Sequence, residues 1–414
     1  MKEGFFEVQS VATCMQILQR FDPVGEMEDL DVGSALARVL ASDALSDEEL
    51  PAFSRSSMDG YAVRARDCFG ASEANPVYLT IKAALAVDEK PDCALLPGEC
   101  AQIYTGGTLP QGADAVVMAE YTRGIADDEI EIFKPLGPGD NVMLAGEDCG
   151  RGQVAVGAGT RLRPQELGIL AALGYSRVPV LRPPRVAILS TGDELVPVHE
   201  KPAPGMVRDV NSTTLAAWCS RAGAEPIPMG IIRDSLPQLQ EAIRGAAAES
   251  DLVLVSGGSS VGTRDYCIEA ISSLPLGRVM VHGIALSPGK PTIVAAQGRV
   301  PIIGLPGQVT SAQVVMYVLG LPFLRHLGGQ VHAFQGERQA RVTARVTRNI
   351  SSPQGREDYV RVKIVHDPET GVSAEPILAK SGLLRSLLLA DGLLPIPAQS
   401  EGVMAGDTQE VWLL

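Results

Sequence analysis

The hydrophobic and polar positions change their period several times along the chain, which predicts several folded units rather than one. In residues 1–50 apolar side chains recur at helical spacing, so we expect a mainly helical segment with helices at residues 8–21 and 32–40. From residue 51 to residue 149 short alternating segments are separated by Gly, Pro and Asp, a pattern typical of a small β-rich unit. Its strands are expected at residues 77–81, 102–104, 115–118 and 129–133.

A further helix is expected at residues 164–173, because Pro164 suits the first helical turn and Glu166 lies in that turn. Residues 183–325 alternate short apolar strands with longer helical segments, which indicates βαβ units and a parallel sheet. The expected strands are residues 186–189, 226–232, 252–255, 279–282, 292–295 and 302–305, and the expected helices are 212–222, 235–249, 265–273 and 310–319. Beyond Gly328 strict alternation returns and predicts a separate small β domain.

These segments together predict a multidomain protein of the α/β plus β class. Its expected units are a helical and linker region at residues 1–50 and 150–174, a β-rich domain at 51–149, an α/β domain at 175–327 and a C-terminal domain at 328–414. The length of 414 residues agrees with this division, because domains of about 150 residues would number roughly two to four.

Composition excludes several classes of protein. The net charge of −14 disfavours broad attraction to nucleic acid or to anionic membranes, so we expect neither as a partner. No segment approaches the roughly 20 apolar residues of a bilayer span, and the N-terminus lacks the apolar run of a secretory signal, so we expect a cytoplasmic protein. The seven cysteines show no CxxC spacing and the five histidines no HExxH motif, which argues against a disulfide framework and a zinc site.

Candidate chemistry begins with an acidic segment, STGDEL, that follows the first predicted strand of the α/β unit. Ligands in open α/β sheets bind outside the carboxyl ends of strands, and the adjacent carboxylates of Asp193 and Glu194 could hold a hard cation such as Mg²⁺. An ordinary acidic loop explains this motif equally well.

Two glycine-bearing turns also follow predicted strands. In SGGSSVGTRD, residues 256–265, backbone N–H groups and serine hydroxyls could cradle an anion, although the GxxxxGK[ST] phosphate loop is missing. A tight strand-to-helix turn is an equally good explanation. The segment GLPGQ, residues 304–308, repeats the arrangement, and three such turns on one sheet edge favour a binding site more than any one of them does.

Three isolated residues have ordinary explanations beside functional ones. Asp59 precedes Gly60 and could be a ligand or a base, but a structural turn is the commoner role of this pair. Lys290 could meet a phosphate, although a solvated loop lysine is commoner. Asp234 is expected to cap the helix that follows it.

The order of the motifs is more specific than any one of them. PAFSRSSMDGYAV, YTGGTLPQGADAVVM, GEDCGRG, STGDEL, NSTTL, RDS, SGGSSVGTRDY, SPGKP and GLPG follow one another over nearly the whole chain. The set resembles the MoeA-type molybdopterin molybdenumtransferase family, which includes the E domain of gephyrin. The resemblance implies an elongated linker region, a β-rich domain, a three-layer molybdopterin-binding α/β domain and a C-terminal β-barrel. It also implies a homodimer whose active cleft lies between the α/β domain of one subunit and the β-rich domain of the other.

The resemblance further implies the insertion of molybdate, or tungstate, into adenylylated molybdopterin with Mg²⁺ and the release of AMP. Carried over by motif, the catalytic residues are Asp59, Glu194, Asp234 and Asp265, and the Mg²⁺ ligands are Asp59, Asp193, Glu194 and Asp265. The substrate-binding residues are Thr105, Gly257, Gly258, Ser259, Ser260, Lys290, Pro306 and Gly307.

The chain departs from the family pattern at three places. Residues 142–145 are apolar where the family usually carries arginines, Gly283 and Ser287 stand where lysines are common, and Gln308 alters the usual LPGNPVS turn. Each change removes a cation or alters a turn near the expected oxyanion site. Because one charge-assisted contact is worth about 1.5–3 kcal/mol, we expect these changes to weaken the binding of the oxyanion. The first alternative hypothesis is a noncatalytic pterin-binding or scaffold paralogue, and the second is another nucleotide pyrophosphatase that uses the same α/β domain.

Overall fold

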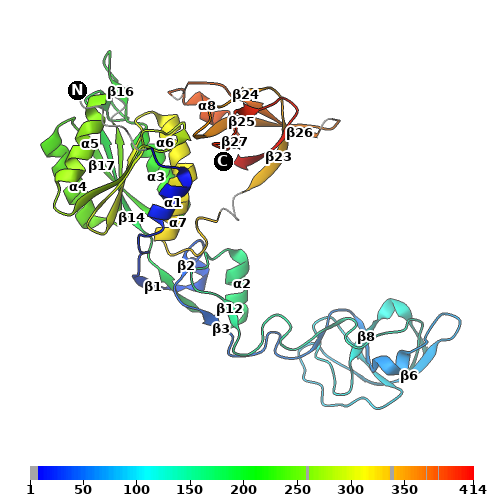
Figure 1. Ribbon diagram of the computed structural model, residues 1–414. Coiled ribbons are helices and arrows are strands. Elements are labelled where there is room, and N and C mark those ends of the chain that lie inside the picture. The colour runs from blue at the N-terminus through cyan, green and yellow to red at the C-terminus, as the bar shows by residue number, and fades with distance from the viewer. Residues whose placement is uncertain (1–7, 258–260, 336–339, 370, 381) are drawn as a thin grey trace.

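A computed structural model describes residues 8–257, 261–335, 340–369, 371–380 and 382–414, with the backbone alone for 261–265. The chain is elongated: the α/β domain and the C-terminal barrel lie together at one end, and the β-rich domain lies at the other (Figure 1). The linker region lies between them. None of the described helices combines the length and the apolar character that a membrane crossing requires.

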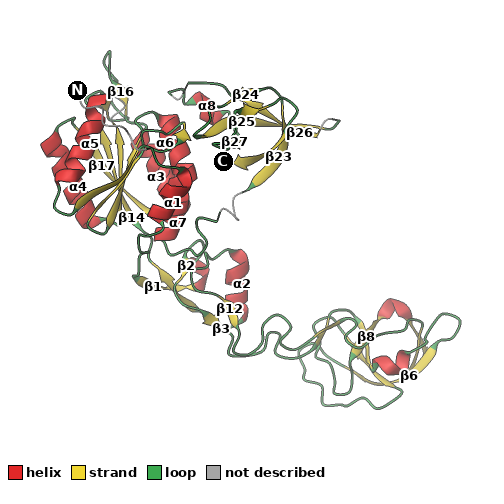
Figure 2. Cartoon of the chain, in the orientation of Figure 1, coloured by secondary structure: helices red, strands yellow, loops and turns green. Residues whose placement is uncertain are grey.

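The α/β domain has three layers, with helices on both faces of a sheet (Figure 2). Within the described residues the sheet has six strands in the order β17-β14-β18-β22-β21-β19. Their bounds are β14 Arg185–Thr191, β17 Glu225–Ile232, β18 Leu252–Gly257, β19 Gly277–His282, β21 Ile293–Gln297 and β22 Val300–Leu305. The short paired segments β15 Leu195–Val196 and β16 Val207–Arg208 project from it. All six expected strands are therefore confirmed.

The direction of one strand differs from the prediction. The sheet is parallel from β17 to β22, as expected, but β21 runs antiparallel to both β22 and β19. Only Gly298 and Arg299 separate β21 from β22. So short a connection can join antiparallel neighbours but not parallel ones, which need a crossover.

The two faces of this sheet bury different side chains because alternate residues of a strand point to opposite sides. Val186 and Ile188 face one helical layer, whereas Ala187 and Leu189 face the other. The first layer contains α1 Val11–Leu18, α3 Asn211–Ala222, α6 Val309–Val315 and α7 Leu321–Leu327, and the second contains α4 Leu236–Glu249 and α5 Val261–Ser273. The N-terminal helix α1 thus belongs to the α/β core.

The helix expected at residues 310–319 continues further than predicted. It runs from α6 through a π-helical turn, η4 Met316–Gly320, into α7. Pro322 lies at the start of α7 and has no N–H to donate to the preceding turn, which accounts for the widened turn before it.

The linker region consists of short strands, irregular segments, one 3₁₀ turn and one α-helix, so the prediction that residues 1–50 are mainly helical is wrong beyond α1. Its elements are β1 Met27–Asp31, η1 Val32–Ser34, β2 Val39–Leu40, β3 Ala44–Leu45, β12 Val154–Val156, α2 Pro164–Ala172 and β13 Arg177–Leu181. Where a helix was predicted at residues 32–40, β2 instead pairs with β13, and Ala35 and Leu40 are buried against residues far along the chain. The spacing of these apolar residues reflects that packing and not a helix.

The β-rich domain contains strands at all four places expected and four further short strands. They are β4 Arg55–Ser56, β5 Gly60–Val63, β6 Val77–Ala84, β7 Glu99–Ile103, β8 Ala115–Met118, β9 Thr122–Ala126, β10 Glu129–Ile132 and β11 Val142–Met143, with short 3₁₀ turns η2 Ala65–Cys68 and η3 Ala119–Tyr121. Within the described residues its main sheet has the order β8-β5-β7-β6-β10-β9, and β4 pairs with β11 beside it.

The C-terminal domain is a closed barrel, as the family resemblance implies. Five of its described strands follow the order β25-β26-β23-β29-β27, and β27 closes the ring on β25. The bounds are β23 Arg341–Val346, β24 Ile350–Ser351, β25 Glu357–Asp367, β26 Gly371–Pro376, α8 Arg385–Leu388, β27 Gly392–Ile396, β28 Gly402–Val403 and β29 Thr408–Leu413. The short strand β20, Leu286–Ser287, reaches from the α/β domain to pair with β25.

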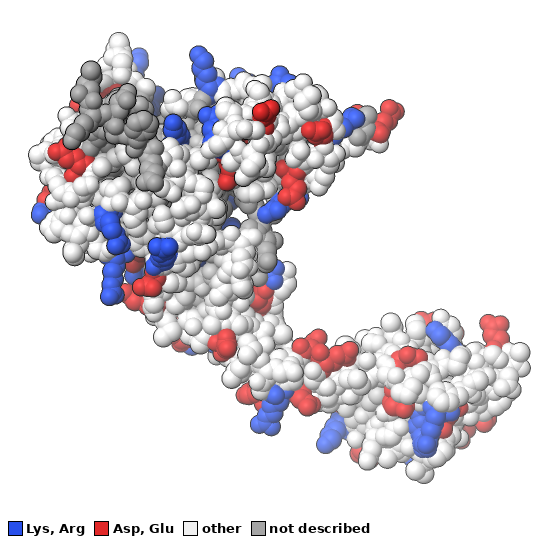
Figure 3. Space-filling view, in the orientation of Figure 1, with Lys and Arg blue, Asp and Glu red and all other residues white. Residues whose placement is uncertain are grey.

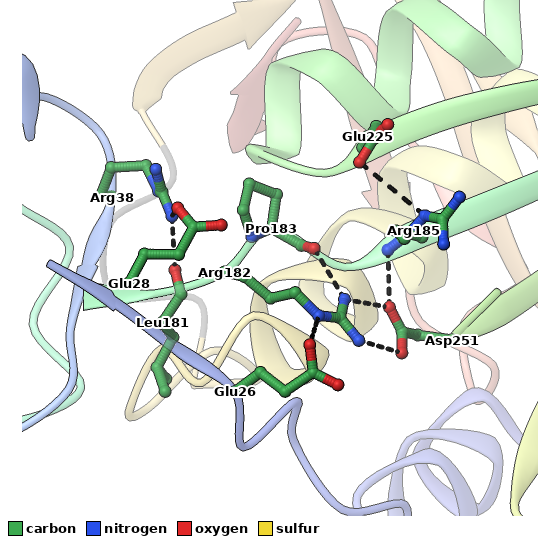
Figure 4. A network of polar contacts seen from close by, with 9 residues as sticks. All are labelled: Glu26, Glu28, Arg38, Leu181, Arg182, Pro183, Arg185, Glu225 and Asp251. Atoms are coloured by element: carbon green, nitrogen blue, oxygen red, sulfur yellow. Dashed lines mark hydrogen bonds and ion pairs between the residues drawn. The ribbon is translucent and has the colours of Figure 1, made fainter. Parts of the chain in front are cut away.

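An arginine holds the linker region to the α/β domain (Figure 4). Arg182 follows β13 and donates to Glu26 before β1 at 2.5 Å and to both carboxylate oxygens of Asp251 at 2.7 and 3.0 Å. Burial alone would raise the pKa of Asp251. The hydrogen bonds from Arg182 and from the backbone of Arg185 outweigh this effect and lower that pKa. One guanidinium therefore bridges three separate segments.

Replacing Arg182 by methionine is expected to loosen this junction by roughly 2–3 kcal/mol, because Asp251 then stays partly buried without its partner. Hydrogen–deuterium exchange should rise around residues 26–28 and 182–185. Arg185→Gln is the control: its ion pair with Glu225 is 4.0 Å long and exposed, so a change of less than about 0.5 kcal/mol is expected. Equal exchange in the two variants would contradict the bridging role.

Candidate functional site

Four segments singled out in the sequence meet at one edge of the sheet. Strands β14, β17, β18 and β22 are parallel, so their carboxyl ends lie side by side. Predicted site residues follow all four strand ends: Asp193 and Glu194 follow β14, Asp234 follows β17, Gly257 ends β18, and Pro306 and Gly307 follow β22. The structure therefore brings these six residues to the same edge.

Hydrogen bonds connect the first two of these segments. The Thr191 hydroxyl donates to Asp234 Oδ1 at 2.9 Å, and the Asp234 N–H approaches Asp193 Oδ1 at 3.4 Å. The expected capping role of Asp234 is wrong, because α4 begins at Leu236 after Ser235 and Asp234 faces Thr191 instead. The carboxylate of Asp193 also pairs with Arg233 at 3.7 Å, whereas Glu194 is exposed beside it.

Gly257 has no room for a side chain. A Cβ placed on it would lie 2.2 Å from the backbone oxygen of Thr191, and its φ of +156° is one that other residues rarely adopt. The ends of β14 and β18 therefore approach each other more closely than side chains permit. A ligand at this edge would meet backbone groups of both strands.

Buried polar residues form a floor beneath this edge, and sequence reasoning overlooked them. Asn211, 7 % exposed, donates to Ser256 Oγ at 2.6 Å and to the Gly307 carbonyl at 3.0 Å, which joins α3 to the end of β18 and to the turn after β22. Its Oδ1 is buried without a hydrogen-bond partner among the described residues. The NSTTL motif contained this residue, but local pattern could not show that it spans two other segments.

A pocket of about 410 Å³ opens beside the floor. It lies between the β15–β16 projection, the start of α3 and strand β17, and Asp209, Ser212 and Arg233 supply its polar lining. Asp209 accepts hydrogen bonds from the N–H and the hydroxyl of Ser212 at 3.1 and 2.5 Å. The pocket is large enough for part of a small organic molecule, with one acidic and one basic group in its wall.

A second group of predicted residues lies in the β-rich domain. Asp59 is exposed, and its Oδ1 accepts hydrogen bonds from the backbone N–H of Thr105 at 2.8 Å and from the Thr105 hydroxyl at 2.9 Å. These two bonds lower the pKa of Asp59, so this carboxyl stays ionised at lower pH than a free aspartate. Gly60 fixes the position of Asp59 against strand β8, because a Cβ on Gly60 would lie 1.9 Å from the Val117 backbone oxygen.

The remaining predicted residues contribute less to the geometry. Lys290 is exposed in the loop between β20 and β21, where its carbonyl accepts from the Ile284 N–H at 2.9 Å. Gly258, Ser259 and Ser260 lie outside the described residues, as does the side chain of Asp265.

Asp59 and Glu194 do not meet within one chain. The β-rich domain that carries Asp59 and the sheet edge that carries Glu194 lie at opposite ends of the molecule (Figure 1). Among the described side chains no group of three or more His, Cys, Asp or Glu is arranged to hold a metal ion. On the face shown in Figure 3, cations lie singly or in small groups among acidic side chains.

Comparisons with known proteins cover almost the whole chain. Residues 9–174 match the family model described as MoeA N-terminal region (domain I and II), residues 187–326 a probable molybdopterin binding domain, and residues 343–414 the MoeA C-terminal region (domain IV). The chain is 33 % identical to the molybdopterin molybdenumtransferase of Bacillus subtilis over 95 % of its own length and 91 % of that protein. It is 36 % identical to the enzyme of the same name from a Nostoc species, over 83 % and 78 %.

A solved structure is similar over the same range. The chain superposes on a molybdopterin biosynthesis MoeA protein from Pyrococcus horikosii with a TM-score of 0.73 and 36 % identity, covering 98 % of this chain and 99 % of that one. The similarity therefore includes the order and the fold of all the units.

Proposed function

This chain belongs to the MoeA family, and from that membership we propose that it is a molybdopterin molybdenumtransferase, which inserts molybdate or tungstate into adenylylated molybdopterin and releases AMP. The observation that carries the proposal is the common sheet edge, where Asp193, Glu194, Asp234 and the turns at Gly257 and Gly307 meet inside the part that matches a molybdopterin binding domain. The cytoplasm is the compartment proposed for this biosynthetic step.

The active cleft is proposed to form between two copies of the chain. Asp59 and Glu194 lie at opposite ends of one molecule, so both can reach one substrate only if the β-rich domain of a second copy approaches the sheet edge. A closed homodimer presents the same pair of surfaces twice and would form two equal clefts.

In this cleft different groups of the chain have different roles. Gly257 at the end of β18 and the turn after β22 offer backbone N–H groups to the phosphates, and Asn211 holds these two segments together. The ionised carboxylate of Asp59 accepts a hydrogen bond from the attacking water and orients it. Glu194, exposed at the sheet edge, faces the same reacting phosphate from the other side of the cleft.

The carboxylates present are compatible with Mg²⁺ only across two copies. Asp59 has one oxygen engaged by Thr105, and the Glu194 side chain makes no hydrogen bond or ion pair with the described residues. Each therefore offers a free carboxylate oxygen, and Mg²⁺ often uses one or two carboxylates with substrate phosphates. When bound, Mg²⁺ would neutralise phosphate charge in the transition state. Asp59, Asp193, Glu194 and Asp265 remain its proposed ligands.

The noncatalytic alternative is less well supported, because the relatives that cover most of the chain are named as transferases and the acidic residues carried over by motif are retained. The deciding experiment incubates purified protein with adenylylated molybdopterin, Mg²⁺ and either molybdate or tungstate. Release of AMP together with metal incorporation supports the transferase. Tight binding of the pterin without turnover would leave only the scaffold function.

Arg55 is proposed to supply a cation that the apolar residues 142–145 do not. It stands opposite Met143 in the β4–β11 pair, and Ser56 next to it bonds to Gly106 and Gly107 beside Thr105. Its guanidinium packs 4.6 Å from the Phe53 ring centroid. Among the described residues it has no ion pair, and its buried Nε has no hydrogen-bond partner.

Arg55→Gln is therefore expected to raise the KM for the oxyanion or the pterin nucleotide by roughly 10-fold to 100-fold, the value of one charge-assisted contact, with little change in melting temperature. Steady-state kinetics of AMP release measure it. Arg66→Gln is the matched control, because Arg66 is exposed on the same domain and pairs with Asp67. An unchanged KM in Arg55→Gln would contradict the proposed role of Arg55 in binding the substrate.

A further inference from the structure

A small cavity lies at the junction of the linker region and the α/β domain, at the amino ends of the strands and thus opposite the proposed cleft. Its volume is about 20 Å³, enough for one small ion or water molecule. Residues of both units line it, including the arginines Arg38, Arg161, Arg182 and Arg325 and the glycines Gly223 and Gly328. No acidic side chain of the described residues is part of the lining.

Two of the four arginines are neutralised by carboxylates (Figure 4). Arg38 donates to Glu28 at 2.7 Å and to the Leu181 carbonyl at 2.9 Å. Arg182 bonds to Glu26 and Asp251, as described above. These two side chains have their counter-charges within the junction itself.

The other two arginines have no ion pair with any described residue. Arg161 makes one hydrogen bond, from Nε to the Ala37 carbonyl at 3.3 Å. The Nε of Arg325 is buried without a partner. Burial, followed by the positive charges of Arg161 and Arg221, lowers the pKa of Arg325, and burial lowers that of Arg161. Two partly buried cations that repel each other raise the free energy of the folded state unless a negative charge lies between them.

The charge of the cavity suits a monovalent ion. Helices α3 and α7 end at Gly223 and Gly328 in its wall, and each carboxyl end carries roughly half a negative charge. The four arginines of the lining and Arg221, which acts on Arg325, carry five positive charges, whereas Glu26, Glu28 and Asp251 carry three negative ones. The two helix ends offset about one more positive charge, so about one positive charge is left. The small volume likewise favours a single atom over a large oxyanion.

We propose that this cavity binds a monovalent inorganic anion of the size of chloride, held between Arg161 and Arg325. Arg161 belongs to the linker region and Arg325 to α7 of the α/β domain, so the ion joins the two units. It acts beside the Arg182 bridge and keeps the linker region, and with it the β-rich domain, at a fixed angle to the sheet. The proposal is independent of the chemistry in the cleft.

Thermal melting at equal ionic strength tests this site. Relative to potassium gluconate, whose anion is too large for the cavity, potassium chloride is expected to raise the melting temperature by about 2–4 °C, because the ion binds only the folded state. In Arg325→Gln and Arg161→Gln this difference should vanish. In gluconate the melting temperatures of Arg325→Gln and Arg161→Gln should be no lower than that of the unmodified protein, because each substitution removes the repulsion between these two arginines. Arg244→Gln changes an exposed arginine of α4 that does not line the cavity, and this variant should keep the chloride effect.

Three results would overturn the proposal: equal melting temperatures in both salts, a chloride effect that persists in Arg325→Gln, or its loss in Arg244→Gln. An equally large, Arg325-dependent effect of sulfate would contradict the monovalent assignment. A bromide soak of crystals of the unmodified protein gives an independent measurement that needs no variant. An anomalous peak between the two guanidinium groups supports the site, and only water there refutes it.

Discussion

Replacing Asp59 by asparagine is expected to lower the rate of AMP release by roughly 10²-fold or more, because the cleft loses the ionised carboxylate that orients the attacking water. The fold should not change. Asp59 is exposed, and the amide oxygen of asparagine can still accept both hydrogen bonds from Thr105. The rate is measured with adenylylated molybdopterin, Mg²⁺ and molybdate.

Asp88→Asn provides the matched control, since Asp88 is another exposed aspartate of the β-rich domain. It should turn over at the unmodified rate. The melting temperature of both variants should equal that of the unmodified protein. If Asp59→Asn kept more than about half of the activity, neither a metal-binding nor a water-orienting role for Asp59 would survive.

Mixing two inactive variants is expected to restore activity. A heterodimer of one Asp59→Asn chain and one Glu194→Gln chain contains one cleft with both carboxylates intact and one with neither, so about half of the unmodified activity should return. The reason is the distance between the two residues in one molecule, which makes each cleft take its carboxylates from different copies. Co-expression with two different affinity tags isolates the heterodimer for the assay.

The reciprocal heterodimer tests the same geometry in the opposite direction. A chain with both substitutions, paired with an unmodified chain, damages both clefts if each is shared and should be nearly inactive. If each chain instead held a complete site, this heterodimer would keep about half of the activity and the mixed one would have none. The two outcomes exclude each other, so the activities of these two heterodimers decide whether the cleft is shared between the chains.

The pattern of neighbouring residues was sufficient to predict a helix or strand wherever that pattern is typical of one kind of element. The strand at Ala115–Met118 was expected at the bounds it has, and the helix beginning at Pro164 was recognised from its first turn. The strands of the α/β domain were found because four to seven apolar residues between turns or helices have few other arrangements. Their order predicted that STGDEL, SGGSS and GLPG lie at one sheet edge, whereas Asp234 of RDS was expected to cap a helix.

Local pattern failed where a distant partner decides the conformation. Residues 32–40 have apolar residues at helical spacing, yet Leu40 pairs with Val180 in a sheet. The direction of β21 follows from a two-residue connection that the apolar runs do not reveal. Asp234 has the composition of a helix cap but bonds to Thr191, which lies on a neighbouring strand.

The sequence by itself determined the number and kind of the units, most of their strands and the acidic and glycine-bearing motifs of the proposed cleft, because these depend on the period and chemistry of neighbouring residues. The tertiary structure alone decided which of these groups meet. It placed Asn211 between the end of β18 and the turn after β22 and set Asp59 and Glu194 at opposite ends. It also brought Arg161 and Arg325 together without an ion pair to any described residue. Such contacts join residues far apart in the chain, and no local pattern encodes them.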